Sequence, residues 1–308
     1  VVVVDGSAES LPVSILRLFS DNIAYVHEPK SLAERLKIAC GYVTTPYTVL
    51  CGDDEFLSIH CLGSCINYLS DNPGYVSCMG VALGFKLDKN ELVARPIYSD
   101  LLSHQITGST CFERCNEHFR KYTPVYMYSV TRSELWCSVF GNPRGVEIDL
   151  FCFAEFQSEV SFCVAGKSKI LPELYWLRSF ENSSALGSDK TLDSNNSLRK
   201  IWFSDERRLA KIDLIEVLAD GLQGKVMNTR EEVVLAINLA LQRYLVFEKK
   251  RSLNKKSLFQ FLWSRVRRRI IGFFRPNWMP IEHEFMRLKE MGIHVPTQLF
   301  AKIKICLQ

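Results

Sequence analysis

A short apolar run that ends in three consecutive acids constrains the fold of this chain more than any other feature. Residues 47–51 are aromatic, β-branched or small and apolar, and Pro46 stands just before them, so they predict a short buried strand. Asp53, Asp54 and Glu55 follow. Because open α/β sheets place ligands at the carboxyl ends of their strands, we expect a divalent cation such as Mg²⁺ or Mn²⁺, or a cationic group, beside these mutually repelling carboxylates.

The same acids also fit a solvated turn that precedes a helix. Carboxylates are stabilised near a helix N-terminus, and the helical pattern of residues 56–69 begins directly after Glu55. The run alone does not decide between a cation site and such a turn.

Strand and helix patterns alternate along the first 180 residues or so. The strand patterns lie at residues 1–4, 23–26, 47–51, 75–85, 125–131 and 169–174. The helix patterns lie at residues 11–19, 31–41, 56–69, 99–122, 132–140 and 146–165. Ser31 and Glu34 form a capping box, and residues 88–90 predict a tight turn. The alternation predicts an α/β fold with a mostly parallel sheet flanked by helices.

A polar segment divides the chain. Residues 181–197 are rich in Ser, Asn and Asp, which is typical of a linker. We therefore expect an α/β domain over residues 1–180, a linker over 181–200 and a helical C-terminal region over 201–308. Helix patterns in that region lie at residues 205–220 and 258–274, and Thr229 with Glu232 caps a third helix.

The cysteines and the hydropathy pattern indicate the compartment. Eleven cysteines are scattered through apolar contexts without the spacing of a disulfide framework, which favours a reducing compartment and buried thiols. No signal peptide is visible, and no apolar run approaches the roughly 18 residues that cross a bilayer. We expect a cytoplasmic protein that can lie peripherally on the inner face of a membrane.

Cys111, Cys115 and His118 fall on one face of a predicted helix and invite comparison with a zinc site. A second ligand pair at zinc-site spacing is missing from the sequence. Buried thiols beside a surface histidine are therefore the expected arrangement.

Four segments carry a family resemblance. Residues 1–7 form an apolar run that ends in Asp-Gly-Ser, and residues 31–41 contain Arg35. Residues 51–55 are acidic, and residues 145–150 read Gly-Val-Glu-Ile-Asp-Leu. In this order and spacing they resemble the nucleotide-sugar-dependent glycosyltransferases of the GT-A fold, close to the large family 2. The family's first strand and helix would then stand upstream of Val1, so we expect a missing upstream segment.

The resemblance implies roles in donor binding. Asp5 would accept hydrogen bonds from the base or ribose of the nucleotide, and Gly6, Ser7, Arg35 and Asp53 would complete that site. Asp54, assisted by Asp53, would hold the Mg²⁺ or Mn²⁺ that bridges the diphosphate. Gly52 stands where the family has the first acid of its DXD motif, which leaves the metal to fewer carboxylates.

The resemblance also implies a catalytic base. Glu147 occupies the position of the family's catalytic Asp, and Asp149 is the competing candidate. A carboxylate opposite the leaving diphosphate would take the proton of the acceptor hydroxyl, so we expect an inverting enzyme. The alternative is that both acids simply favour a helix N-terminus.

Aromatic and basic residues supply acceptor-site candidates. Tyr126, Tyr128, Arg132 and Trp136 lie where such enzymes handle the sugar or the acceptor. Aromatic faces stack on pyranose rings, and Arg pairs with phosphate or carboxylate. Core aromatics with a surface Arg are the alternative.

A basic segment near the C-terminus suggests a partner. Residues 249–275 contain ten Lys and Arg and no acid, with aromatic and aliphatic residues at helical spacing. An interfacial helix on anionic lipid has this composition, and a lipid-linked acceptor would lie at such a surface. We favour lipid over nucleic acid, and an ordinary amphipathic helix packed on the α/β domain is the further alternative.

The expected function is transfer of a sugar from a nucleotide-sugar donor to a glycan or lipid-linked acceptor. The alternatives are a nucleotidyltransferase on a related sheet and a non-catalytic module that binds a nucleotide sugar or glycan, the second suggested by Gly52.

Overall fold

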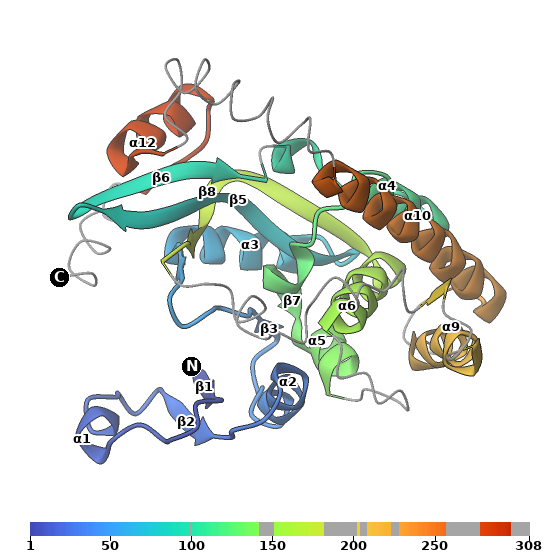
Figure 1. The fold of residues 1–308 in the computed structure, drawn as a ribbon, viewed down its shortest axis with the longest axis horizontal. Helices are drawn as coiled ribbons and strands as arrows, with labels where there is room; N and C mark the ends of the chain where they lie inside the picture. Colours follow the sequence, from blue (N-terminus) through green and yellow to red (C-terminus); the bar gives the residue numbers. More distant parts are fainter. Residues whose placement is uncertain are drawn as a thin grey trace.

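The structure is a computed structural model that describes residues 1–98, 100–141, 151–181, 202–203, 208–222, 228–256 and 278–296. Two sheets and several helices form these parts (Figure 1). The strands are β1 (Val2–Asp5), β2 (Ala24–His27), β3 (Tyr47–Thr48), β4 (Phe56–Leu57), β5 (Tyr75–Asp88), β6 (Glu91–Ile97), β7 (Val130–Arg132), β8 (Lys167–Ser179) and β9 (Met279–Pro280). The helices are α1 (Val13–Leu16), α2 (Leu32–Cys40), α3 (Ile59–Asp71), α4 (Cys111–Arg120), α5 (Ser133–Phe140), α6 (Phe151–Ala165), α9 (Arg208–Leu222), α10 (Arg230–Lys256) and α12 (Ile281–Glu290), with 3₁₀ turns η1 (Leu101–Ser103) and η2 (Tyr126–Tyr128).

Strand β5 is the centre of the main sheet. Within the described residues this sheet has seven strands. Strands β7 and β6 pair with successive parts of β5, and β3 and β9 pair with β7 and β6 respectively. Strand β8 also pairs with β5, over residues 75–85, and β4 pairs with β8. Strand β8 is parallel to β5, whereas every other pair in this sheet is antiparallel. The prediction of a mostly parallel sheet is therefore wrong for the main sheet.

A hairpin explains part of this difference. Lys89 and Asn90 connect β5 to β6, and their φ angles of 50° and 67° are those of a two-residue type I′ turn. The predicted turn is confirmed, and a turn this short can only join antiparallel strands.

Strand β8 is the parallel strand, and it is irregular. Met79 pairs with Ile170 and Val81 with Leu174, so three residues of β8 bulge out opposite one residue of β5. Pro172 lies in this bulge, where its missing N–H breaks no ladder bond. A Cβ at Gly80 would collide with the carbonyl oxygen of Glu173, so a glycine is needed where the bulge crosses β5.

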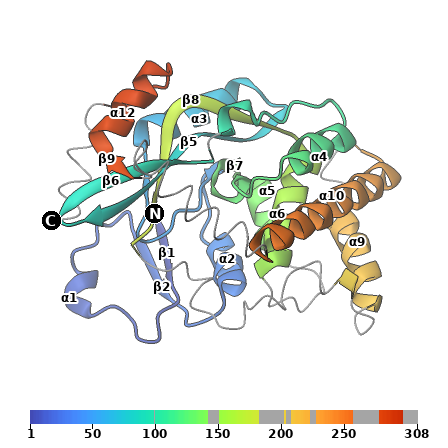
Figure 2. The same ribbon diagram turned by 45° about the horizontal axis from the view of Figure 1, so that its top comes forward.

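The first strand was expected in a parallel sheet, buried. Strand β1 does pair in parallel with β2, in the register Asp5↔His27, but the two form a separate sheet. Its residues are half-buried rather than buried. In both ribbon views this pair and α2 lie to one side of the main sheet (Figures 1 and 2).

Three apolar clusters hold the helices. The largest lies between α3, α5, β5 and β8 and contains Trp136 and Trp176. A second joins α4 and α6 to α9 and α10. In the third cluster, Phe285 of α12 packs with Leu83 of β5 and Leu177 of β8.

Several predicted boundaries move. The predicted helix 99–122 is instead η1 followed by α4, and the predicted strand 125–131 is η2 followed by β7. Residues 56–57, predicted as helix, form β4 on the edge of β8. Each segment is shorter than its sequence pattern because tertiary pairing overrides local propensity.

The C-terminal helices share a core with the α/β part. The capping box of Thr229 and Glu232 is confirmed, with Glu232 N donating to Thr229 Oγ1 at 3.3 Å and Thr229 N donating to Glu232 Oε2 at 2.9 Å. The division at residues 181–200 stays a prediction, since 182–200 lie outside the described residues. None of the described helices is both long and apolar enough to cross a bilayer.

Candidate functional site

The turn after β1 holds an ionised carboxylate. Asp5 accepts hydrogen bonds from the Ser7 backbone N–H at 2.8 Å and from the Tyr25 hydroxyl at 2.6 Å. Hydrogen bonds from Ser7 and then Tyr25 lower the pKa of Asp5 to about 2. The Asp5 carboxylate is therefore a permanent acceptor at the end of a strand.

Arg35 lies against this turn. The capping box of Ser31 and Glu34 begins α2, and Arg35 Nη1 donates to the Val4 carbonyl at 3.2 Å. A Cβ at Gly6 would lie 2.6 Å from the Arg35 guanidinium carbon, so the guanidinium fits only because this residue is glycine. The buried Arg35 Nε has no hydrogen-bond partner among the described residues. The structure thus brings Asp5, Gly6, Ser7 and Arg35 into one group.

The acidic segment forms a loop between β3 and β4. The predicted buried strand 47–51 is wrong beyond Thr48, because β3 has two half-buried residues and lies antiparallel to β7. Asp53 is exposed and Asp54 half-buried. Burial first, and then the charges of the three acids, raise the pKa of Cys51 to about 11. The loop therefore has the negative potential that a cation would relieve.

Glu55 is not the solvated acid that a simple turn would have, because its carboxylate contacts residues of β8. Its Oε2 accepts a hydrogen bond from the Trp176 indole N–H at 2.8 Å, and Arg178 Nε lies 3.7 Å from its Oε1. Burial is the main cause that raises the pKa of Glu55, although Trp176 and Arg178 oppose it.

Two tyrosines flank the same indole. Tyr128 stacks on Trp176 with ring centroids 4.6 Å apart, and Tyr98 stacks at 6.2 Å. Arg178 Nη1 donates to the Tyr98 hydroxyl at 2.8 Å. We call Glu55, Tyr98, Tyr128, Trp176 and Arg178 the Trp176 cluster.

Of the Trp176 cluster, the sequence analysis considered Tyr128 for the sugar and Glu55 among the acids beside a cation, but not Tyr98, Trp176 or Arg178. Trp176 and Arg178 were missed because the predicted strand ended at residue 174, whereas β8 continues to Ser179. The motif Tyr-Trp-Leu-Arg after Pro172, which combines aromatic rings with a cation, is the signal that could have identified them.

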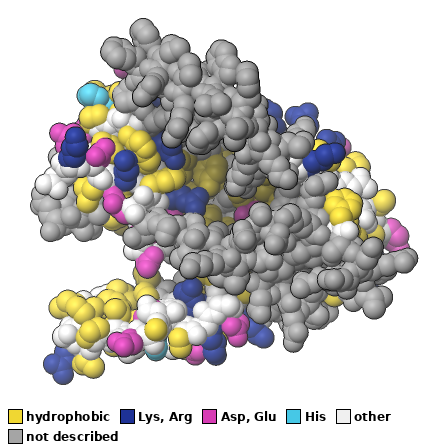
Figure 3. All heavy atoms as spheres, in the orientation of Figure 1, with side chains coloured by type: hydrophobic (Ala, Val, Ile, Leu, Met, Phe, Trp, Pro, Cys, Tyr) yellow, Lys and Arg dark blue, Asp and Glu magenta, His cyan; other side chains and the backbone are white. Residues whose placement is uncertain are grey.

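Figure 3 shows how this face is shaped. The lobe around β1 and β2, at the lower left, is set off by a recess from the main sheet above it, and side chains of both charges, Lys or Arg and Asp or Glu, border the recess.

The other acceptor candidates have structural partners. Arg132 donates to the carbonyls of Leu69 at 2.7 Å and Tyr75 at 3.0 Å, so its guanidinium closes the C-terminal end of α3. Trp136 is 2% exposed and packs on Phe140 in the largest core cluster. A role for Arg132 and Trp136 in sugar binding stays a prediction.

The proposed base lies in another part of the chain. Glu147 and Asp149 lie outside the described residues, as does most of the basic segment 249–275, of which residues 249–256 end α10. Their roles stay predictions.

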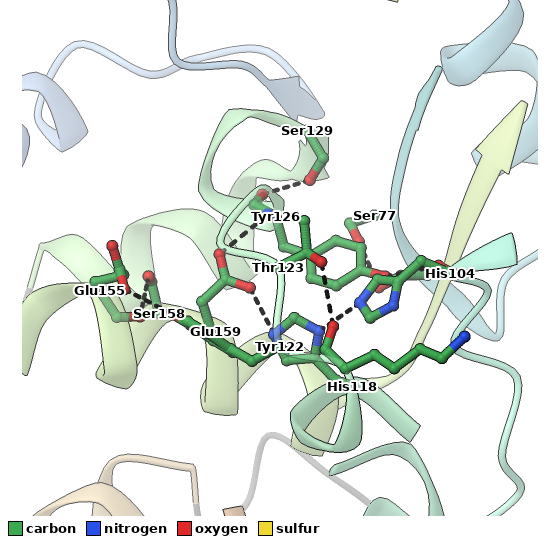
Figure 4. Close-up of polar contacts among 12 residues, drawn as sticks. Ser77, His104, His118, Tyr122, Thr123, Tyr126, Ser129, Glu155, Ser158 and Glu159 are labelled. Carbon is green, nitrogen blue, oxygen red and sulfur yellow. Dashed lines mark hydrogen bonds and ion pairs between the residues drawn. The ribbon is translucent and has the colours of Figure 1, made fainter. Parts of the chain in front are cut away.

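A second polar group is fully buried (Figure 4). His118, expected at the surface, is 0% exposed; its Nε2 lies 2.8 Å from Glu159 Oε2, and its Nδ1 lies 2.9 Å from His104 Nε2. Burial raises the pKa of Glu159 and lowers the pKa of His118 to about 3. Both shifts favour the neutral forms, so this close contact between α4 and α6 carries no net charge.

Comparison with known proteins identifies the fold. No protein-family model matches the sequence, and no curated protein matches it. A crystal structure of S. aureus TarS, segment 1–349, matches with a TM-score of 0.51 and 9% identity, covering 84% of this chain and 66% of that one. Two further structures match with TM-scores of 0.43 and 0.42 and identities of 11% and 10%: S. aureus TarS, covering 80% of this chain and 49% of that one, and the 1–349 segment in complex with UDP, covering 82% of each.

The likeness at 0.51 confirms the predicted resemblance to the GT-A fold. The GT-A assignment rests on this likeness, since the main sheet is mostly antiparallel. The chain spans just under two thirds of that TarS structure.

Proposed function

We propose that this chain is a nucleotide-sugar-dependent glycosyltransferase. The observation that carries the proposal is the turn after β1, where Asp5 is held ionised and Arg35 packs on Gly6, on a fold shared with TarS. A fixed carboxylate recognises the hydroxyl and N–H donors of a ribose or base. The neighbouring guanidinium, with an unsatisfied Nε, suits a phosphate oxygen.

A nucleoside diphosphate sugar is the donor class that these groups fit. TarS, whose fold this chain shares, has been crystallised with UDP. We extend that ligand class to this chain as part of the proposal and leave the base and the sugar open.

Asp53 and Asp54 fit a hard divalent cation. Both are carboxylates on one loop of negative potential, and Gly52 beside them offers no side-chain ligand. Mg²⁺ or Mn²⁺ accepts one or two protein carboxylates and takes its other ligands from water and phosphate. When bound, the cation neutralises charge on the departing diphosphate. The chain's own residues hold the donor and the acceptor.

The Trp176 cluster is the proposed sugar-side wall. Tyr98 and Tyr128 are half-buried, so part of each ring is available to a pyranose face, and Arg178 supplies a cation beside them. Glu55 fixes both Trp176 and Arg178, which keeps this wall in one arrangement.

Glu147 or Asp149 completes the proposal as general base. Removal of the acceptor proton from the face opposite the leaving group gives direct displacement and inversion. The proposed acceptor is a hydroxyl of a glycan or of a lipid-linked glycan, and the basic segment 249–275 would bring the enzyme to anionic lipid.

Donor hydrolysis and donor binding test the proposal together. A panel of nucleoside diphosphate sugars with Mn²⁺ should include one that raises the melting temperature and is slowly hydrolysed. Asp5→Asn should weaken its binding by about 10- to 100-fold, since a hydrogen bond to a charged group contributes about 1.5–3 kcal/mol. Asp88→Asn, an exposed acid at the β5–β6 hairpin, is the matched control and should bind normally.

The outcomes separate the alternatives. Binding without hydrolysis or transfer would indicate a non-catalytic module, and pyrophosphate release from a nucleoside triphosphate would indicate a nucleotidyltransferase. Absence of binding by every donor would overturn the proposal. Glu147→Gln and Asp149→Asn then identify the base, because only loss of the base removes transfer and keeps donor affinity.

A further inference from the structure

Three metal-ligating side chains meet on a part of the molecule that the donor site does not use. His60 lies in the first turn of α3, Glu173 in the bulge of β8, and His294 just after α12. One ligand atom from each lies within 4.8 Å of the other two. Among the residues that the structure describes, no other group of three or more His, Cys, Asp or Glu side chains converges in this way.

The backbone fixes two of the three residues relative to each other. His294 N donates to the Pro172 carbonyl and Leu174 N donates to the His294 carbonyl, both at 2.8 Å. These bonds bracket Glu173, which pairs with His294 as an isolated parallel bridge. The bulge that turns Glu173 outward is thus covered by the chain segment that carries His294.

The side chains are already oriented toward one another. His60 Nδ1 lies 3.2 Å from Glu173 Oε2, and the rings of His60 and His294 have centroids 4.5 Å apart. Ser64, one turn further along α3, donates to the same Oε2 at 3.0 Å. A hydroxyl that orients a ligating carboxylate is the usual second layer of a metal site.

The chemistry of this donor set selects the metal. Two imidazole nitrogens and one carboxylate oxygen suit Zn²⁺ and related transition metals, whereas Mg²⁺ and Ca²⁺ prefer oxygen ligands alone. Bonds of 2.0–2.1 Å in a tetrahedron separate neighbouring ligands by roughly 3.3 Å, so the atoms need to close by about 1.5 Å at most. The His60 side chain is 55% exposed and can rotate to do so, while Glu173, at 19%, is the anchored ligand.

We propose that His60, Glu173 and His294 bind a zinc ion, with solvent at the fourth position, that fastens the segment 278–296 to α3 and β8. The segment otherwise rests on apolar contacts of Ile281, Phe285 and Leu288 with the main sheet. A metal that joins positions 60, 173 and 294 links residues that are far apart in the sequence. It stabilises the folded state and not the unfolded chain, because the three ligands converge only in the folded protein. The site shares no residue with the proposed donor site.

Zinc titration of the full 308-residue chain, stripped with chelator and kept reduced, tests the proposal. A chromophoric chelator as competitor gives affinity and stoichiometry, and Co²⁺ gives the visible bands of a tetrahedral site with nitrogen and oxygen ligands. Because second-layer changes alone weaken metal binding by about 10- to 100-fold, Ser64→Ala should fall in that range. His60→Gln, Glu173→Gln and His294→Gln should each lose the site.

Controls separate this site from thiols and from misfolding. His283→Gln, an exposed histidine of α12, should bind zinc like the wild type, and Cys51→Ser removes the one thiol that is exposed among the described side chains. With free zinc at 100 times Kd, the folding equilibrium of the wild type should shift by a factor of about 100, and that of His294→Gln should not shift. In chelator the two proteins should unfold alike, which shows that the variant folds.

Equal zinc stoichiometry and affinity in the wild type, His60→Gln and His294→Gln would overturn the proposal. So would a Co²⁺ spectrum dominated by thiolate charge transfer that survives both substitutions.

Discussion

The indole N–H of Trp176 donates a 2.8 Å hydrogen bond to Glu55, and this bond joins the acidic loop to β8 across 121 positions of the chain. The loop that carries Asp53 and Asp54 is thereby held by a residue of the central sheet. The same carboxylate pairs with Arg178, so one half-buried acid positions an aromatic ring and a cation together.

Trp176→Phe tests this connection. The ring is retained, but the Glu55 carboxylate loses a donor in a buried place, so the free energy of unfolding should fall by about 1–3 kcal/mol. Adding Glu55→Gln should cost less than in the wild type, because the two residues interact. Urea denaturation of the single and double variants measures both effects. Strictly additive losses would mean that the bond contributes nothing.

Gly6→Ala tests the packing of Arg35 on the turn after β1. The new Cβ would lie 2.6 Å from the guanidinium carbon and displace Arg35, so donor affinity should fall by about tenfold or more if a charged hydrogen bond is lost. Isothermal titration with the donor found in the screen measures this. Gly63→Ala, in α3 with nothing within 4 Å of its Cβ position, should leave affinity intact and stabilise the helix by about 0.5–1 kcal/mol. In an Arg35→Ala background, Gly6→Ala should have no further effect.

Arg132→Ala tests whether this residue supports α3 or handles the sugar. Its guanidinium donates to three carbonyls at or after the end of the helix, those of Leu69, Asn72 and Tyr75. Loss of these bonds should lower the free energy of unfolding by about 2–4 kcal/mol, and Arg132→Lys should be intermediate because a single ammonium cannot reach all three. Donor and acceptor KM values should stay unchanged. Unaltered stability with a raised acceptor KM would instead place Arg132 at the acceptor.

The buried His104 predicts a pH dependence. Burial, then the charges of His118 and Lys121, lower the pKa of His104 to about 3. The unfolded chain takes up a proton below about pH 6.5 that the folded chain refuses, so this residue destabilises the fold as pH falls from about 6.5 towards 3. Between pH 7.5 and 5.5 the wild type should lose about 1.4 kcal/mol relative to His104→Gln. Urea denaturation of both proteins at the two pH values measures the difference, and a constant difference would contradict it.

Local features were predictable because their causes are local. The capping box of Ser31 and Glu34, the one at Thr229 and the turn at Lys89 and Asn90 each depend on residues within four positions, and all three occur in the structure. The direction of the sheet was not predictable in this way. A strand followed by a helix fits a parallel neighbour, yet β7 returns to β5 in the opposite direction after η1, α4 and η2.

The candidate site divides along the same line. The resemblance predicted a site of Asp5, Gly6, Ser7 and Arg35, and these residues do meet around the β1 turn, although α2 carries Arg35. Tyr98, Trp176 and Arg178 escaped because the members of the Trp176 cluster come from four segments that only the tertiary structure brings together, as the pairing of β4 with β8 does for Glu55 and Trp176. His118 was expected at the surface because nothing in the sequence links it to Glu159, 41 positions later, whose carboxyl group lies 2.8 Å from its Nε2 in the core.

The single parallel pairing of the main sheet has a consequence for how the chain reaches this state. Strand β5 is buried along most of its length, and β8, which covers one of its edges, is synthesised about 90 residues later. Until then a nascent chain carries an open apolar strand edge, the kind of surface on which chains associate. Pairing of β5 with a strand so distant in the sequence is also slow, because the entropy cost of closing the intervening loop precedes any gain from the contacts. Co-translational shielding of residues 75–85 should therefore govern the yield of folded protein more than the final stability does.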